Sequence, residues 1–563
     1  MLRDQCRGPR IIRDSRDAAR PHRVTHAERH TDEVKNAAGL GIHGWRRVFL
    51  CPPVVVLGNR VENRVPAQPS RKRDAVFHDR PRKMRVIGLS HQLDAAMNRT
   101  DDHFATPVTQ KPVPRRDSNA DPRRVSGDNE RMLRPTLRFW PVLLVVVLAV
   151  PGASAQVRYQ ILLKGGHVID PRNQVDAVMD VAVADGKIAA VRAGIDPAEA
   201  TTVVDVSGLY VMPGLIDAHV HVFATTGMKG AWAGDNSVLP DEFSFRTGVT
   251  TMVDVGSSGW RNFEDFRNRV IDRAATRVFA MLNIVGLGML TDVPEQNIQD
   301  MDPKATADMA IKHRDVVVGI KSAHYQGPEW VSVDRAVEAG KAAGIPVMVD
   351  FGYFREERPY YKLVTERLRP GDISTHMFRG PVPYVDANGK LLDYLKEARA
   401  RGVLFDVGHG GGSFVFRTAV PAVQQGFYPD TISTDLHTGS MNGAMMDMLT
   451  TMSKFLVMGV QLNDVIRQST VNPAKMIQHP ELGHLSPGAD ADIAVLRVME
   501  GRFGYADGSR GTIAGNRRLM CEMTLKAGRV VWDWNARTGT DYRKMSSDYG
   551  IRDVDKIILP PKK

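Results

Sequence analysis

Cysteine is scarce in this sequence, which limits what can stabilise the fold. The chain has 563 residues and 3 cysteines. Cys6 and Cys51 fall within the first 131 residues, so Cys521 is the one cysteine in the remainder. A single cysteine cannot form an intrachain disulfide, and burial of apolar side chains must stabilise the fold instead. With 43% apolar residues, a chain of this length can bury a large core over two or more domains.

Excess positive charge is absent from most of the chain. The formal net charge is +11, but it is not evenly spread. Residues 1–131 hold 27 Lys and Arg against 16 Asp and Glu, whereas residues 132–563 hold 48 of each. The remainder therefore lacks the basic excess that is typical of nucleic-acid binding, and we expect no nucleic-acid partner for it.

The first 131 residues also lack any apolar period typical of a helix or strand, as in RKRDAVFHDRPRKMR, 71–85. One interpretation is a disordered basic arm, which would make the protein a nucleic-acid-binding fusion. We favour an over-extended reading frame whose true start is Met132, because an export signal begins at that methionine.

Residues 132–155 have the form of a signal peptide. Two arginines precede the apolar stretch 139–150, and Ala153-Ser154-Ala155 supplies a small-residue cleavage site before Gln156. The apolar stretch is shorter than the roughly 20 residues that a membrane-spanning helix needs. We therefore expect a periplasmic or secreted protein with no stable membrane insertion after cleavage. The alternative is a retained N-terminal anchor.

The stretch VMPGLIDAHVHV, 211–222, ends an apolar run with His219 and His221. Side chains on a strand alternate between its two faces, so both histidines are expected on the same side. Two imidazoles at the end of a buried strand supply half of a divalent-metal site. The alternative is one hydrogen-bonded core histidine and one surface histidine.

Short apolar strands alternate with amphipathic segments in the middle of the chain. The expected strands cover 214–222, 250–257, 277–286, 316–323, 346–353, 372–380, 403–410 and 431–438, with helical segments such as 333–344 and 391–402 between them. Eight such units in about 270 residues predict an α/β fold, a (β/α)8 TIM barrel over 214–482. An open doubly wound sheet is the alternative.

Strand-rich segments flank the predicted barrel on both sides. Asp185-Gly186 lies between alternating apolar runs and predicts a hairpin. Residues 490–498 and 523–533 have the same strand character. We expect 156–213 and 483–545 to form one composite β-sandwich, followed by a C-terminal tail over 546–563.

Polar side chains recur at the carboxyl ends of the predicted barrel strands. They are His219, His221, Lys321, Asp350, His376, His409, Asp435 and His437. In a barrel these strand ends meet at one mouth, where active sites are built. An ion pair can explain one such residue, but polar residues on six of the eight strands predict an active site.

Five motifs of the chain are PGLIDAHVH, GIKSAHY, DISTHMFRG, FDVGHGGGSF and TISTDLHTGS. Together they resemble the amidohydrolase superfamily of metal-dependent hydrolases, in its deacetylase branch related to D-aminoacylases and dihydroorotase-like enzymes. The resemblance covers about residues 159–535. It implies that His219 and His221 hold the more buried metal ion, that His376 is a ligand from the sixth strand, and that Asp435 is both ligand and general base.

The same resemblance implies that Lys321 is carboxylated and bridges two metal ions. A free ammonium group cannot bind a cation, so this role requires the modification. The alternative is an ordinary lysine paired with Asp350 or Asp435.

Asp350 departs from the pattern, because many members of the superfamily have histidine at the end of the fifth strand. A carboxylate can bind Zn²⁺, so Asp350 is a candidate ligand. The extra negative charge could also favour Mn²⁺ or a single ion. We therefore expect one or two divalent ions, with Zn²⁺ as the first choice.

Three further residues are candidates for substrate binding. His409 lies in the glycine-rich VGHGGGSF, where backbone can approach a ligand closely, and Arg379 and His437 could bind an acidic group of a substrate. Each has a simpler alternative. His409 could be exposed on a tight turn, and the other two could neutralise neighbouring carboxylates.

These features predict hydrolysis of an amide or ester bond in a small molecule by metal-activated water, with Asp435 as general base. Resemblance to deacetylases favours an N-acyl amino acid or an acylated hydroxy acid as substrate. The alternatives are a cyclic amide hydrolase of the dihydroorotase, hydantoinase or imidazolone type, and a metal- or ligand-binding relative without catalysis. The oligomeric state is left open.

Overall fold

The computed structural model describes residues 157–223, 237–289 and 293–552, which belong to the unit Phe139–Lys563. The expectations for the leader 1–131, the signal 132–155 and the end of the tail, 553–563, lie outside the described residues. Within the described ranges, no helix combines the length and the apolar character needed to cross a membrane.

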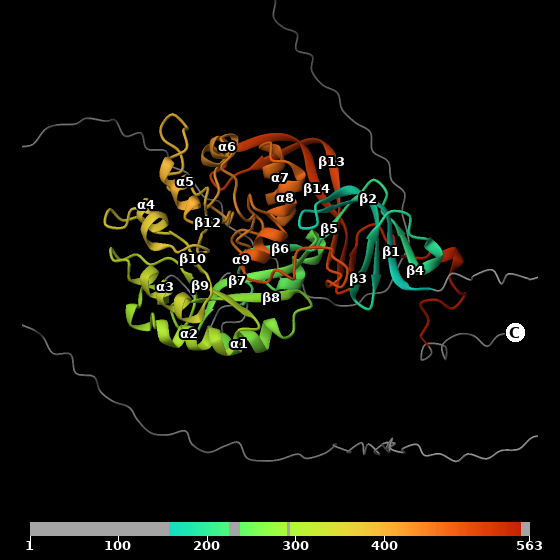
Figure 1. Cartoon of the computed structure of the whole chain (residues 1–563), viewed down its shortest axis with the longest axis horizontal. Helices are drawn as coiled ribbons and strands as arrows, with labels where there is room; N and C mark the ends of the chain where they lie inside the picture. The colour runs from blue at the N-terminus through green and yellow to red at the C-terminus, as the bar shows by residue number, and fades with distance from the viewer. Residues whose placement is uncertain (1–156, 224–236, 290–292, 553–563) are drawn as a thin grey trace, which may run out of the picture. The chain divides into compact units, whose positions relative to one another are not determined.

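A parallel sheet of seven described strands is formed by the middle of the chain (Figure 1). In sheet order these are β6 (Leu215–Val220), β7 (Val249–Gly259), β8 (Arg277–Asn283), β9 (Val317–Ser322), β10 (Val347–Val349), β11 (Ile373–Ser374) and β12 (Leu404–Phe405). Every residue of β6 and of β7 is buried, as is typical of parallel strands covered on both faces.

Residues 431–436 connect the two edges of this sheet. Thr431 forms a parallel bridge with Asp406, which follows β12, and Leu436 forms one with Val220 of β6. The sheet is therefore curled and joined edge to edge through this segment, which is consistent with the predicted barrel. The eighth strand expected over 431–438 appears as isolated bridges, not as a regular strand.

Side chains from successive parallel strands meet in one compact core. The cluster takes one or more residues from each of β6 to β11, together with α9 (Val471–Met476): it includes Ile216, Val253, Met281, Val318, Met348, Ile373, Ala474 and Met476. One apolar cluster therefore runs across six neighbouring strands of the sheet and is covered by α9.

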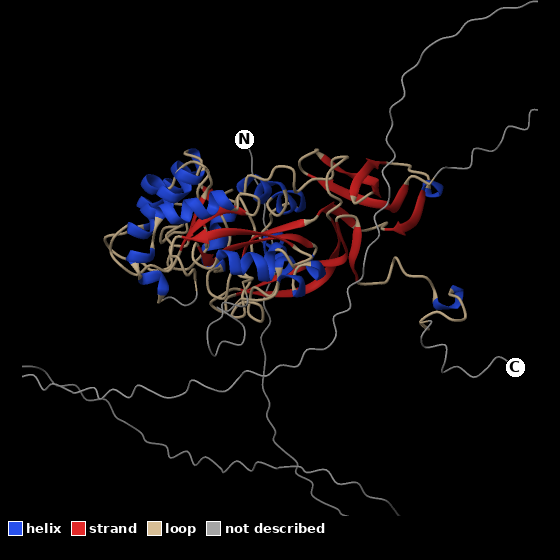
Figure 2. Ribbon diagram, turned by 90° about the horizontal axis from the view of Figure 1, so that it is seen from below, coloured by secondary structure: helices blue, strands red, loops and turns tan. Residues whose placement is uncertain are grey.

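Helices cover the parallel sheet (Figure 2). The others described are α1 (Phe263–Phe266), α2 (Pro303–Lys312), α3 (Val331–Ala343), α4 (Tyr360–Lys362), α5 (Asp393–Ala400), α6 (Phe416–Gln424), α7 (Met448–Val457) and α8 (Leu462–Arg467). Helix α3 buries Val333, Ala336 and Ala339, an amphipathic spacing, and ends at Gly344 in the left-handed conformation. The predicted helical segments 333–344 and 391–402 correspond to α3 and α5.

The flanking segments pair into one mixed sheet. Its path is β15 (Arg529–Asp533), β14 (Thr512–Lys526), β13 (Ile493–Ala506), β5 (Tyr210–Pro213), β1 (Tyr159–Asp170), β2 (Val175–Ala184) and β3 (Lys187–Arg192), with β4 (Ala200–Asp205) beside β1. β5 joins the two segments, because it pairs with β1 on one side and with β13 on the other. Packing of this sheet as a two-layer sandwich stays a prediction.

Local turn chemistry explains the β2–β3 hairpin. Asp185 and Gly186 both have positive φ, 50° and 74°, as a two-residue hairpin turn requires. By contrast, the segment 490–498 belongs to a longer strand, because β13 continues to Ala506, and the segment 523–533 contains the end of β14, a turn at Ala527 and Gly528, and β15. Residues 499–518 are largely exposed or half-buried, so they show little of the apolar alternation from which a strand is predicted.

Candidate metal centre

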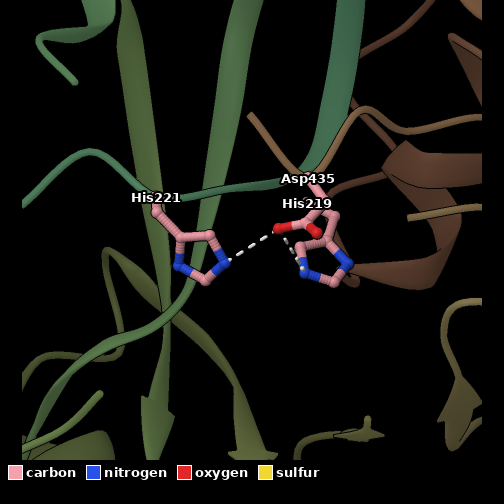
Figure 3. Close-up of side chains that lie close together, drawn as sticks. All are labelled: His219, His221 and Asp435. Atoms are coloured by element: carbon pink, nitrogen blue, oxygen red, sulfur yellow. Dashed lines mark ion pairs between the residues drawn. The ribbon is translucent and has the colours of Figure 1, made fainter. Parts of the chain in front are cut away.

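His219, His221 and Asp435 converge at the end of β6 (Figure 3). Nε2 of His221 lies 3.1 Å from Oδ1 of Asp435, and Nε2 of His219 lies 3.6 Å from the same oxygen. All three residues are buried. Both histidines therefore point to the same side, as the alternation of the strand predicts, and they face one carboxylate oxygen.

Backbone geometry holds Asp435 in this position. Its φ is 51°, in the left-handed region that side-chain-bearing residues seldom adopt. Gly410 packs directly against it, since a Cβ added to this glycine would lie 2.3 Å from Oδ2 of Asp435. Gly408 makes a similar close approach to His219 and His376. The glycine-rich motif is therefore required by the packing of the site itself.

The outer nitrogens of both histidines are engaged by protein oxygens. Nδ1 of His219 lies 2.9 Å from the hydroxyl of Thr375, and that hydroxyl donates to the carboxylate of Asp406. The hydroxyl must therefore accept from Nδ1–H, which leaves the Nε2 lone pair of His219 facing Asp435. Nδ1 of His221 lies 3.0 Å from the hydroxyl of Ser257.

The charge state of the cluster suits cation binding. Burial and the nearby Lys321 lower the pKa of His219 to about 3, so its imidazole is neutral at physiological pH. Burial alone would raise the pKa of Asp435, but His219 and the hydrogen bond from His221 hold it well below its ordinary value. A neutral imidazole and an anionic carboxylate are both donors that Zn²⁺ and related ions prefer.

Lys321, on β9, is buried at the centre of the site. Its Nζ lies 3.4 Å from Nε2 of His219 and 3.8 Å from the sulfur of Met348. Among the described residues, no ion pair joins Lys321 to a carboxylate, so the alternative of a pair with Asp350 or Asp435 is not observed. Burial lowers the pKa of this amine below its ordinary value.

A second group forms around Asp350, which follows β10. Oδ2 of Asp350 lies 3.2 Å from Nε2 of His376 and 3.2 Å from Nε2 of His324. His376 has φ of 59° and contacts the carbonyl oxygen of Gly408 through Nδ1, over 2.6 Å. Burial would raise the pKa of Asp350, but His376 and His324 lower it well below its usual range.

The expected substrate-binding residues occupy different environments. Nη1 of Arg379 lies 3.5 Å from Oδ1 of Asp350, and Nε2 of His437 lies 3.9 Å from Oδ2 of Asp435, with each side chain about a quarter exposed. His409 is fully buried, and its ring nitrogens contact Gly410 O and Lys454 Nζ. A substrate contact by His409 stays a prediction.

Three residues near the centre were not predicted from the sequence. Asp406 and Glu295 are buried carboxylates behind His219 and His324, respectively. His324 follows the end of β9 by two residues, so the rule that selected polar residues at strand ends could have found it. Glu295 lies in a segment without strand or helix periodicity, and its sequence gives no such signal.

The sequence of this chain is similar to those of known proteins. The model of the Amidohydrolase family matches residues 210–531. A protein named deacetylase from Agrobacterium fabrum is 34% identical over 345 residues, which cover 60% of this chain and 82% of that protein.

Solved structures are also similar to this chain. A crystal structure of an adenine deaminase is similar with a TM-score of 0.61 and 27% identity, and the match covers 67% of this chain and 100% of that one. For a crystal structure of a dihydroorotase the TM-score is 0.57 at 28% identity, with 66% and 99% of the two chains covered.

Proposed function

The chain belongs to the amidohydrolase family, and from this premise we propose that it is an exported metal-dependent hydrolase that cleaves amide or ester bonds of acylated small molecules, in the manner of a deacetylase or N-acyl amino acid deacylase. The convergence of His219, His221 and Asp435 carries the proposal. The relative named deacetylase supports this substrate class over others.

The residues of the site fit a divalent cation. Two imidazole nitrogens face one carboxylate oxygen, and each imidazole is oriented by a protein oxygen at Nδ1. We propose that His219, His221 and Asp435 hold one ion and that Lys321, Asp350 and His376 contribute to a second. Zn²⁺ is the first choice, and Mn²⁺ is the alternative because Asp350 adds a carboxylate.

We propose that the Lys321 side chain is present in this site as a carbamate. The neutral amine, favoured by burial, attacks CO₂, a bond forms between Nζ and carbon, and Nζ loses one proton to solvent. The product is an anion with two oxygen donors. It replaces a cation that would repel metal ions, and the amine that carries it lies 3.4 Å from Nε2 of His219.

A bound divalent ion polarises the scissile carbonyl and makes a water molecule more acidic. A residue of the chain then transfers the proton. Asp435 is anionic, and we propose that it accepts the proton of the attacking water and delivers it to the leaving amine or alkoxide. Arg379 and His437, at the edge of the site, are proposed to bind the acidic group of the substrate.

A cyclic amide hydrolase is the second candidate, and the similarity to a dihydroorotase structure favours it. A panel of substrates separates the two functions. It contains N-acetyl amino acids, O-acetyl hydroxy acids, and hydantoin and dihydropyrimidine rings. We expect turnover of an open-chain member and none of the rings, whereas ring opening alone would contradict the deacylase proposal. Turnover of no member by metal-loaded protein would favour a binding protein without catalysis.

Export is a separate part of the proposal, because the leader and signal lie outside the described residues. Expression from Met132 should give a mature protein that begins at Gln156. Amino-terminal sequencing of the periplasmic or secreted fraction tests this. A mature chain that keeps residues 132–155 would contradict the export signal, and residues before Met132 in the protein isolated from its native host would contradict the over-extended reading frame.

A further inference from the structure

A long hairpin connects the mixed sheet of β1–β5 and β13–β15, the flanking sheet, to the domain of the parallel sheet. β13 and β14 pair as far as Ala506 and Thr512, and we call the turn between them, 507–511, the tip. Behind the tip, β14 packs on α7, where Leu519 donates its N–H to Oγ of Ser453 over 3.0 Å (Figure 1). The hairpin is therefore fixed against a helix of the other domain.

The tip binds the chain just after the glycine-rich segment, 408–412. Oδ2 of Asp507 accepts the N–H of Phe416 over 2.9 Å, and Gly508 donates its N–H to the carbonyl oxygen of Phe414 over 2.8 Å. The tip also packs on the segment itself, since a Cβ added to Gly508 would lie 2.7 Å from a Cα atom of the segment. Two hydrogen bonds and a close backbone contact therefore join the flanking sheet to this part of the site.

Asp507 is held in the orientation that this contact needs. The residue is only 6% exposed, and its Oδ1 accepts the N–H groups of Ser509 and Gly511 over 2.9 and 2.6 Å. Its Oδ2 is left for Phe416, the first residue of α6. The N-cap residue of that helix, Val415, has no side chain that could accept this hydrogen bond. The flanking sheet thus supplies the carboxylate cap that the sequence of α6 lacks.

The glycine-rich segment requires support from outside. It contains three successive glycines, 410–412, and glycine loses more conformational entropy on folding than any other residue. One end lies beside the metal centre, where Gly410 donates its N–H to the carbonyl oxygen of Thr434 over 2.8 Å and packs on Oδ2 of Asp435. The other end has the contacts of the tip. The segment is therefore fixed from two sides, one of them supplied by the flanking sheet.

Side chains make a second connection between the tip and Gly410. The ring of Phe414 stacks on that of His409, with centroids 4.7 Å apart and planes at 11°. Nε2 of His409 lies 2.6 Å from Nζ of Lys454, and its Nδ1 lies 2.9 Å from the carbonyl oxygen of Gly410. A shift of Phe414 would therefore move the glycine that packs on the proposed general base.

We propose that Asp507 is a positioning residue of the active site: from the tip it holds the glycine-rich segment in place, and that segment holds Asp435 in the orientation that proton transfer requires. Asp507 acts through Phe416 and does not contact the substrate. The flanking sheet is thereby a working part of the site. This inference rests on the proposed function, because it takes Asp435 as the general base.

Asp507→Asn tests this role with little change of shape. An amide has one acceptor oxygen, so if that oxygen stays with Ser509 and Gly511, an NH₂ group faces the N–H of Phe416 and the hydrogen bond is lost. Hydrogen exchange of residues 408–416, followed by mass spectrometry, reports on the segment. kcat and KM for the substrate identified from the panel report on the site.

Asp170→Asn is the matched control. Asp170 is also buried in the flanking sheet, and its Oδ1 likewise accepts N–H groups of its own turn, from Arg172 and Asn173. Its Oδ2 accepts the N–H of a distant residue, Leu485, over 2.8 Å. Leu485 packs in the core of the flanking sheet, away from the glycine-rich segment.

We expect at least about 10-fold faster exchange over 408–416 in Asp507→Asn, because the segment opens more readily. Its kcat should fall at least about 10-fold, with KM within about twofold of wild type, since the general base is misplaced and substrate binding is retained. Asp170→Asn should keep the wild-type exchange of 408–416 and the wild-type kcat.

Gly508→Ala is a second variant of the same contact and replaces Asp507→Asn if that protein does not fold. Its Cβ would lie 2.7 Å from Cα of Gly412 and would push the tip away, so the same changes are expected. Gly504→Ala, in the same hairpin, is its control, because no heavy atom lies within 4 Å of a Cβ added there.

The outcomes separate this inference from the proposed function. Wild-type exchange over 408–416 in Asp507→Asn would overturn the inference, whether or not a substrate is turned over. Faster exchange with wild-type kcat would also overturn it, because the segment would then not position Asp435. An equal loss of kcat in Asp170→Asn would do the same. A folded, metal-loaded wild type that hydrolyses no member of the panel would contradict the proposed function instead.

Discussion

Asp435 donates its backbone N–H to the carbonyl oxygen of His219 over 2.7 Å, and the side chains of the same two residues approach to 3.6 Å. The backbone contact forms where residues 431–436 meet β6. The contact that joins the two edges of the curled sheet therefore lies within the candidate metal centre. A change that disturbs one should disturb the other.

Gly410 offers a direct test of that coupling. A Cβ at this position would lie 2.3 Å from Oδ2 of Asp435, and its φ of 52° is strained for alanine. Because displacement of a catalytic group by about 1 Å can cost about 100-fold in rate, we expect Gly410→Ala to lower kcat by that order. Steady-state kinetics with the substrate identified from the panel measure the effect.

Gly412→Ala is the matched control, because no heavy atom lies within 4 Å of a Cβ added there and its φ is not in the left-handed region. We expect near-wild-type kcat for it. Equal activity of Gly410→Ala and Gly412→Ala would show that Asp435 does not depend on the glycine-rich segment.

The sequence predicted the parts of the site that follow from strand alternation. His219 and His221 were expected on one side of a strand, and they are. The predicted strands over 372–380 and 403–410 proved shorter, because the backbone turns into the left-handed region at His376 and Gly408. Such turns depend on contacts between segments distant in sequence, which periodicity does not report.

The buried polar support of the site was harder to predict. Lys454 stands within the apolar stretch TMSKFL, and its contact with His409 at 2.6 Å brings together residues from separate elements. A lone lysine in an apolar helix does indicate a buried partner, but the sequence does not identify that partner. Glu295 gave no signal of any kind.

Arg379 tests the class of substrate. If it binds a substrate carboxylate, Arg379→Met should raise KM for an N-acetyl amino acid about 10–100-fold, as expected for loss of a charged hydrogen bond of about 1.5–3 kcal/mol. The methyl ester of the same substrate should lose much less. The comparison requires kcat/KM for both compounds with both proteins, and a uniform loss for acid and ester would exclude carboxylate recognition by Arg379.

The lowered pKa of Lys454 predicts that the free energy of unfolding depends on pH. Burial lowers its pKa to about 7, against the opposing effects of Asp507 and Asp447, and its Nζ contacts Nε2 of His409. Between pH 7 and 9 the unfolded chain therefore binds more protons at this lysine than the folded chain does. The free energy of unfolding should rise with pH by up to about 1.4 kcal/mol per unit from this group.

Lys454→Met should remove that rise, because methionine does not titrate. Denaturant unfolding of wild type and variant at pH 7 and pH 9 measures the difference in slope. Lys396→Met, at a side chain that is 61% exposed, is the control and should keep the wild-type slope. If Lys454→Met and wild type show the same pH dependence, Lys454 is not held with a lowered pKa.

Metal content per chain, measured together with hydrolysis, tests the central claim most directly. Wild type and Asp435→Asn, both expressed from Met132, are analysed by plasma mass spectrometry and assayed on the same substrate. We expect one or two ions in wild type, and turnover that Asp435→Asn reduces at least about 100-fold. A well-folded wild type that holds less than about a tenth of an ion after supplementation with Zn²⁺ or Mn²⁺ would contradict the claim.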